Sequence, residues 1–290
     1  MYFDRQIRAQ IFSPDSTFTD YTNELTIENL RIEFSVNKTF SSSTNTCSLR
    51  IYNLSQEKRN ILVEEGSQVR LFAGYRLNAG TQLLFVGDVS NISHTFAQPE
   101  IISTLTCLDG ETTLYNTLIS VSFSERTPIR DVIQYIANRF SVNIAYFAQT
   151  ENKIYNSGFS DTDYGFRLLD NACSALNLRW SIQNGDLYIL NKDDGTIKPP
   201  VEISSFTGMV GIPERYVDKK QFMYNTTLEN GRLSPGWKFS TLLKPDIIPG
   251  DRIRLISPVL SINGVFKVSS IVHSGDNYGD EFTSTFEVYP

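Results

Sequence analysis

Apolar and polar residues alternate over much of the first hundred positions, which is the pattern of half-buried β-strands. Between Leu30 and Val36 every second residue is apolar, and the residues between them are polar or charged. The pattern predicts strands at 6–12, 30–36, 47–53, 69–75, 83–89, 92–96 and 101–108. One short helix should interrupt them, with Ser55 as its N-cap and Gly66 just past its end.

The apolar spacing changes to a helical period after about residue 121. Thr127 is expected to cap a helix that has Pro128 at its first position, and a stripe from Ile129 to Phe140 continues it. A second helix should follow a cap at 161–163 (Asp-Thr-Asp), and Asn184-Gly185 predicts a tight hairpin between strands at 178–182 and 187–190. Residues 122–195 therefore read as a small α/β unit.

The polar, proline-terminated segment 191–200 is the best linker, and strand patterns resume beyond it. The C-terminal strands also repeat the earlier ones. The segment 66–71 (GSQVRL) aligns with 250–255 (GDRIRL), and 89–94 (VSNISH) aligns with 268–273 (VSSIVH). This match indicates a duplicated β unit on either side of the α/β unit.

Composition agrees with strands joined by polar turns. Ser, Thr and Asn number 30, 24 and 21, charged residues are only 20%, and the net charge is −6 without a basic cluster. Nucleic-acid binding is therefore disfavoured. No apolar run is long enough for a membrane span, and the N-terminus lacks a signal peptide's apolar core. Cys47, Cys107 and Cys173 are expected to be reduced and buried in a protein made in a cytosol.

The residues that could carry chemistry are better explained by structural roles. His94 and His273 occupy equivalent places in the repeat, so both are expected to be structural. The loops before Gly195 and Gly279 lack calcium ligands at the required positions. No phosphate loop, zinc spacing or nucleophile motif occurs. The chain is expected to have no catalytic residues, no cofactor and no metal.

A carbohydrate site remains an alternative. Trp180 and Trp237 together with several Tyr could stack on sugars, and 32 acidic residues offer many carboxylate pairs for hydrolysis. Trp180, however, lies in an alternating strand pattern, which favours a core position.

An ordered series of short runs resembles the tail proteins of bacteriophages. The runs are VNKT at 36–39, NTCSLRIYNLS at 45–55, VRLFAGY at 69–75, LFVGDV at 84–89, CLDG at 107–110, TP at 127–128, LRWSI at 178–182, with NG at 184–185, TGMVGIP at 207–213, LLKP at 242–245 and PG at 249–250. Together they cover most of the chain. It is similar to baseplate hub proteins of the late-control protein D group and, more distantly, to the hub part of type VI secretion spike proteins.

The resemblance implies a mainly β fold with two tail-tube-like β-barrels and an inserted α/β domain. The expected domains are a first barrel at 1–121, the α/β domain at 122–195 and a second barrel at 196–290. An alternative returns residues 196–240 to the first barrel, as this family often does.

The function implied is that of a non-enzymatic hub in the virion baseplate, assembled in the host bacterial cytoplasm. A homotrimer of two-barrel chains would form a pseudo-sixfold ring that joins the tail tube to a spike and lets the genome pass. Its partners would be the tail tube protein, baseplate wedge and tape-measure proteins, and a separate spike protein, since no needle or lysozyme-like segment follows Pro290. The alternatives are a distal-tail or tube-like adaptor of an injection device and a carbohydrate-binding or carbohydrate-cleaving tail protein.

Overall fold

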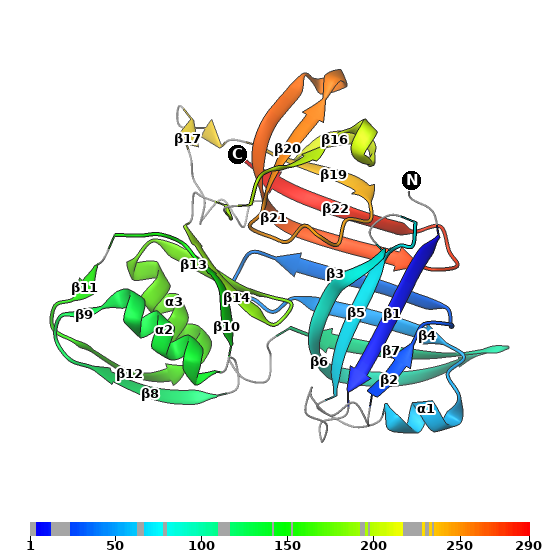
Figure 1. The fold of residues 1–290 in the computed structure, drawn as a ribbon, viewed down its shortest axis with the longest axis horizontal. Helices are drawn as coiled ribbons and strands as arrows, with labels where there is room; N and C mark the ends of the chain where they lie inside the picture. The colour runs from blue at the N-terminus through cyan, green and yellow to red at the C-terminus, as the bar shows by residue number, and fades with distance from the viewer. Residues whose placement is uncertain are drawn as a thin grey trace.

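Two β-rich parts and a compact α/β unit make up the chain (Figure 1). The computed structural model describes residues 4–12, 24–62, 67–77, 80–109, 117–140, 142–151, 153–191, 195–196, 198–216, 228–229, 232–233 and 235–290. Gly66, expected after the first helix, and residues 192–194 and 197 of the expected linker lie outside these ranges. The mainly β character predicted from the sequence is confirmed.

The N-terminal part is a sheet with one short helix. Its elements are β1 (Arg5–Phe12), β2 (Glu24–Ile27), β3 (Ile32–Thr39), β4 (Thr46–Tyr52), α1 (Gln56–Ile61), β5 (Gln68–Tyr75), β6 (Gly80–Ala97) and β7 (Glu100–Leu108). Ser55 caps α1 as expected, since its hydroxyl accepts from the Lys58 N–H. Every second residue of β3 from Ile32 is buried, and Ile32, Phe34 and Val36 join a core that includes Leu49, Leu71 and Phe85.

The C-terminal part has its own core. Its elements are β15 (Val201–Ile203), the 3₁₀ turn η3 (Ser205–Thr207), β16 (Met209–Tyr216), β17 (Leu228–Glu229), β18 (Arg232–Leu233), β19 (Gly236–Leu242), β20 (Arg252–Ser257), the 3₁₀ turn η5 (Pro258–Leu260), β21 (Ile262–Asp276) and β22 (Phe282–Tyr289). Ile203 and Phe239 are buried with Ile271 and Phe286. Within residues 196–240, β15 pairs with β20 and β19 pairs with β22, whereas the domain boundaries stay a prediction.

The two β parts share one sheet. The strand order is β16-β19-β22-β21-β3-β4-β7-β6-β5-β1-β2, with β20 beside β21 and β15 beside β20. The expected separate, closed barrels are not found, since no pairing between described strands closes either part into a cylinder. In the N-terminal part the physical reason is that β3 pairs with β21 of the other part, so its outer edge is not available to close the sheet on itself.

The internal repeat predicted from the sequence is confirmed at the level of strands. Val69–Leu71 lies in β5 and Ile253–Leu255 in β20, and each strand begins a meander, β5-β6-β7 and β20-β21-β22. Both meanders carry a register shift at the same aligned place, at Ser90 in one and Ser269 in the other. The first shift also explains why the strands expected at 83–89 and 92–96 form the single strand β6.

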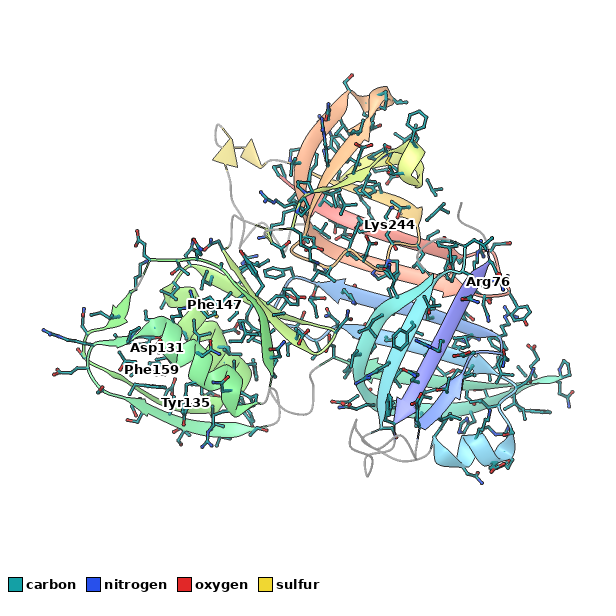
Figure 2. The ribbon with its side chains drawn as sticks, viewed as in Figure 1. Arg76, Asp131, Tyr135, Phe147, Phe159 and Lys244 are labelled. Atoms are coloured by element: carbon teal, nitrogen blue, oxygen red, sulfur yellow. The ribbon has the colours of Figure 1, made fainter. Side chains whose placement is uncertain are left out.

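Two helices packed together form the core of the α/β unit. The unit comprises β8 (Leu118–Phe123), β9 (Thr127–Pro128), α2 (Ile129–Arg139), β10 (Asn143–Phe147), β11 (Ile154–Tyr155), β12 (Phe159–Tyr164), α3 (Gly165–Ala175), β13 (Leu178–Gln183) and β14 (Asp186–Asn191). Phe147 and Phe159 pack against this core from opposite sides of the helices (Figure 2). The predicted Asn184-Gly185 hairpin is confirmed, with positive φ at both residues.

Both predicted helix caps of this unit are wrong. Pro128 is the N-cap of α2, because Thr127 and Pro128 pair with β11 and the Thr127 hydroxyl donates to Ser124 O. Residues 161–163 lie inside β12 and pair with β8, so α3 starts only at Gly165. The Asp161 carboxylate accepts the N–H of the next residue and caps no helix.

Candidate assembly surfaces

The two histidines, which the sequence predicts to be structural, share one geometry. His94 Nδ1 lies 2.9 Å from Ser103 Oγ across β6 and β7, and His273 Nδ1 lies 2.8 Å from Ser284 Oγ across β21 and β22. Their burial differs: His94 is exposed, whereas His273 is fully buried beside β3. Burial and, secondarily, Lys38 hold the pKa of His273 well below its ordinary value.

The three cysteines and the two tryptophans are buried or partly buried by packing. Cys47, Cys107 and Cys173 are free and buried, and burial raises the pKa of Cys107 to about 12, so these thiols are unreactive. Trp180 is buried and donates to Asp170 Oδ1 at 2.8 Å, so it offers no face to a sugar. Arg215 lies over the half-buried Trp237 ring.

Two buried acidic side chains have partners of their own: Asp251 accepts from Thr196 and Lys198, and Asp276, in the loop before Gly279, is paired with Arg31 at 2.8 Å. Residues 192–194 of the loop before Gly195 lie outside the described residues. Within the described part of the chain, no group of three or more His, Cys, Asp or Glu side chains could hold a metal ion. No described helix has the length and apolar character needed to cross a membrane.

A buried polar junction joins the α/β unit to the N-terminal sheet. The tip of the β13–β14 hairpin reaches the ends of β3 and β7 (Figure 1). The carboxylate of Asp109 accepts the N–H groups of Asn184 at 3.0 Å and Gly185 at 3.2 Å. Lys38 Nζ donates to Asn184 Oδ1 at 2.7 Å, and Asn45 Nδ2 donates to Ile182 O at 2.7 Å. Folding therefore satisfies these buried groups only when the hairpin is docked.

Burial dominates the electrostatics of this junction. It lowers the pKa of Lys38 to about 8, although Asp109 acts in the opposite direction. It raises the pKa of Asp109 to about 6, although Lys38 and the hydrogen bond from Asn45 lower it. The junction thus keeps two opposite charges out of water, and the hairpin amides complete their hydrogen bonding.

Exposed apolar side chains gather at one end of the C-terminal sheet. β15 and β20 run in parallel, with Ile203 opposite Leu255, so the turns η3 and η5 that follow them leave the sheet at the same end. Phe206 in η3 is 97% exposed and Val259 in η5 is 74% exposed. Further exposed apolar residues nearby in the fold are Val210, Ile212, Leu260 and Val265. Such a patch is typical of an interaction site.

The sequence contains a signal for this patch that the alternation of apolar and polar residues does not show. Phe206 lies between Ser205 and Thr207-Gly208, and Val259 follows Ser257-Pro258, so apolar residues stand inside turn sequences. Turns lie at the surface, where a large apolar residue is not needed for the core. An apolar side chain in a turn therefore indicates an exposed contact.

Unpaired strand edges are the second assembly feature. β16 ends the sheet order, because among described strands it pairs only with β19. Residues 91–97 of β6 pair with β7 on one side, whereas β5 pairs only with residues 80–88. Exposed strand edges can accept strands from another chain.

The mainly β fold, with two meanders joined in one sheet and an α/β unit beside them, is the fold of solved phage tail proteins. The 43 kDa tail protein of prophage MuSo2 from Shewanella oneidensis has a TM-score of 0.67 at 8% identity, covering 97% of this chain and 96% of its own. A tail protein from Neisseria meningitidis MC58 has a TM-score of 0.66 at 10% identity, covering 98% and 96%.

An Escherichia coli component of the type VI secretion system is also similar, with a TM-score of 0.61 at 11% identity over 90% of this chain and 73% of that one. No curated protein matches the chain. The model of the family Baseplate hub gp41 matches residues 13–288. The chain belongs to this family, and it is a structural component of the baseplate of a phage virion.

Proposed function

We propose that this chain is a non-enzymatic hub that assembles as a homotrimeric ring, joins the tail tube to a separate spike and lets the genome pass. The observation that carries the proposal is the repeated β unit, with β5-β6-β7 and β20-β21-β22 built alike in one chain. Three chains then supply six similar units. Such a ring can meet a sixfold tube on one face and a threefold spike on the other.

Charge is consistent with a conduit. The chain has 26 basic and 32 acidic residues and no cluster of Lys and Arg in its sequence, so a wall built from it would bind passing DNA weakly. The tail tube protein, the spike, and wedge and tape-measure proteins are the partners this role requires. Assembly would occur in the host cytoplasm before the baseplate enters the virion.

The mass of the purified protein in solution, followed by negative-stain imaging, tests the proposal. We expect a particle of three times 32.9 kDa with a central hole. A ring of six chains would instead support a tube-like adaptor. A monomer without a hole that binds or hydrolyses peptidoglycan fragments would contradict the hub and support a carbohydrate-directed tail protein.

A further inference from the structure

The intrachain seam between the two β parts has a defined construction. On one edge, β21 pairs first with β20, over residues 262–267, and then with β3, over residues 270–276. The other edge of β21 is taken by β22. β3 therefore occupies the edge that β20 leaves free beyond the register shift, with Ser35 opposite Ser274 and Val36 opposite His273.

The same edge is open in the N-terminal repeat. β6 corresponds to β21, and residues 91–97 align with 270–276. β5 leaves β6 at the pair Gln68 and Asp88, the aligned place at which β20 leaves β21. No described strand pairs with residues 91–97 on that edge, and all of them except Ile92 are exposed.

The C-terminal repeat also contains an equivalent of β3, the strand β16, which pairs with β19 alone among the described strands. The two β parts have corresponding strand orders, β3-β4-β7-β6 in the N-terminal part and β16-β19-β22-β21 in the C-terminal part. Through these pairings Ser35 corresponds to Glu214 and Val36 to Arg215. β3 is paired with β21, whereas no described strand covers the outer edge of β16.

We propose that β16 of one copy pairs antiparallel with residues 91–97 of β6 in the next copy, repeating between chains the β3–β21 seam within a chain. The inference rests on the proposed function, because it supplies the interface of that ring. In the transferred register, Thr95 lies opposite Glu214 and His94 opposite Arg215 of the neighbouring copy.

The exposed side chains on the two edges suit this contact. Phe96 on β6 is 65% exposed, and Val210 and Ile212 on β16 are 50% and 56% exposed. Phe96 aligns with Gly275, which lies opposite the buried Phe34 in the intrachain seam. In the transferred register Phe96 lies opposite Pro213 and Ala97 lies opposite Ile212, so pairing would remove part of Phe96 and of Ile212 from water.

The irregular part of β16 does not prevent pairing. Its register against β19 shifts between Val210 and Glu214, and Pro213, which has no N–H to donate, lies within that interval. The expected hydrogen bonds are therefore those between residues 214–216 and residues 93–95 of the neighbouring copy.

The geometry of the contact predicts a closed assembly. Each copy offers one β16 edge and one β6 edge, so the contact is head-to-tail. A ring satisfies every edge of this kind, whereas an open chain of copies would leave one edge of each kind at its ends.

Paired cysteines test the register. Thr95→Cys combined with Glu214→Cys should form disulfides between chains on oxidation, because opposite residues of antiparallel strands have closely spaced Cβ atoms. The three native cysteines are buried and stay out of the reaction. We expect a ladder on a non-reducing gel that ends at the trimer, with more than half of the protein cross-linked.

Each single cysteine variant is a control and should stay uncross-linked beyond dimers. Thr95→Cys with Glu202→Cys is a second control, because Glu202 is exposed on β15 and away from the proposed seam. A ring of correct mass whose Thr95/Glu214 pair does not cross-link would overturn the seam and leave the hub intact. A monomer without cross-links would overturn both.

A charge placed on the seam gives an independent measurement. Ile212→Lys should weaken self-association at least tenfold, whereas Leu118→Lys, at an exposed position on β8 of the α/β unit, should leave it unchanged. Equal association of both variants and the wild type would contradict the proposal. Circular dichroism of the monomeric fraction checks that each variant is folded.

Discussion

Asp109 is the residue that connects the α/β unit to the rest of the chain. It follows β7, and its two carboxylate oxygens accept two backbone N–H groups of the hairpin tip and the side-chain amide of Asn45. Asp109 and Asn45 are 1% and 2% exposed, so these two side chains have little access to bulk water. Loss of the acceptor leaves buried donors unsatisfied, which costs more than the hydrogen bonds gained in folding.

Asp109→Ala is therefore expected to lower the free energy of unfolding by about 2–4 kcal/mol. Asp186→Ala is the matched control, because Asp186 lies in the same hairpin and its carboxylate accepts only an exposed bond from Asn143 among the bonds described. It should change stability by less than about 0.5 kcal/mol. Urea unfolding at pH 7 measures both, and equal losses would contradict the role given to Asp109.

The same carboxyl should make stability depend on pH. The pKa of Asp109 is about 6 in the folded chain, and that of an unfolded aspartate is about 3.9. Between these values the folded chain holds a proton that the unfolded chain releases, so this group's contribution to stability grows as the pH falls. The stability of the wild type relative to Asp109→Asn should rise by up to about 3 kcal/mol from pH 6 to pH 4.

Urea unfolding across this interval provides the measurement, and the comparison with the variant cancels the titration of exposed carboxyls. The pKa of Lys38 is about 8 in the folded chain, so its contribution to the stability of the chain increases only as the pH rises above that value. It therefore does not interfere below pH 7. A constant difference between the two proteins would show that Asp109 does not titrate in this range.

The two His–Ser pairs make a second prediction about single residues. Ser284 Oγ accepts the Lys244 N–H at 2.9 Å and also bonds the buried His273, so Ser284→Ala should cost about 2 kcal/mol. Ser103→Ala should cost less than about 1 kcal/mol in the monomer, because water can replace Ser103 at the exposed His94. Thermal unfolding compares the two, and the reverse order would contradict this account.

At the scale of elements, the helix pair of the α/β unit depends on a missing side chain. A Cβ on Gly165, the first residue of α3, would lie 2.1 Å from the ring of Phe140, which is itself buried at the end of α2. The two helices therefore approach at this point more closely than any other residue would allow.

Gly165→Ala should destabilise the unit by about 1–3 kcal/mol through overpacking. Asn171→Ala, at an exposed position in the same helix, should be neutral to within about 0.5 kcal/mol. The buried Trp180 reports on this unit, so its fluorescence during urea unfolding is the measurement. A Gly165→Ala protein as stable as the control would mean that Phe140 has room to move.

Elements with a regular apolar period could be predicted from sequence, and their neighbours in space decided the rest. The stripe of α2, the Asn184-Gly185 hairpin and the strands around Leu30 and Leu71 depend on local pattern, and they were predicted correctly. Asp161 failed because residue types that cap helices also stand in strands, and pairing with β8 decided the outcome. The β3–β21 seam joins residues far apart in sequence, so local pattern could not predict it, and the expectation of two closed barrels was wrong in this respect.

Local chemistry explains the junction only in part. That Lys38 and Asp109 would be buried was not predicted, since a charged residue in an alternating strand usually faces water. Lys38 stands on the same face of its strand as the buried Ile32, Phe34 and Val36, and this alternation indicates that it is buried. Its hydrogen-bond partner, Asn184 of the hairpin, is 146 residues away in sequence and could not be predicted from local pattern.

At the scale of the molecule, the two repeats differ mainly in what covers their third strand. β3 covers β21 and buries His273, whereas the same edge of β6 leaves His94 exposed. The proposed interchain seam would cover the edge of β6 and give His94 the surroundings that His273 has within one chain. The exposure of His94 in a single chain therefore reflects the absence of the neighbouring strand.

Assembly through this seam should weaken in acid. Burial lowers the pKa of a histidine, and two cations would add to this effect at His94: Arg59, which already lowers its pKa, and Arg215 of the neighbouring copy in the proposed register. Ser103 is its uncharged partner. Because the assembled state favours neutral His94, the ring should dissociate as the pH falls below the pKa of His94 in the single chain, which burial and Arg59 already hold below its ordinary value. Sedimentation at pH 7.5 and pH 5.5 measures this, and His94→Gln should remove most of the difference. A wild-type ring equally stable at both values would mean that His94 stays in water, as it is in the single chain.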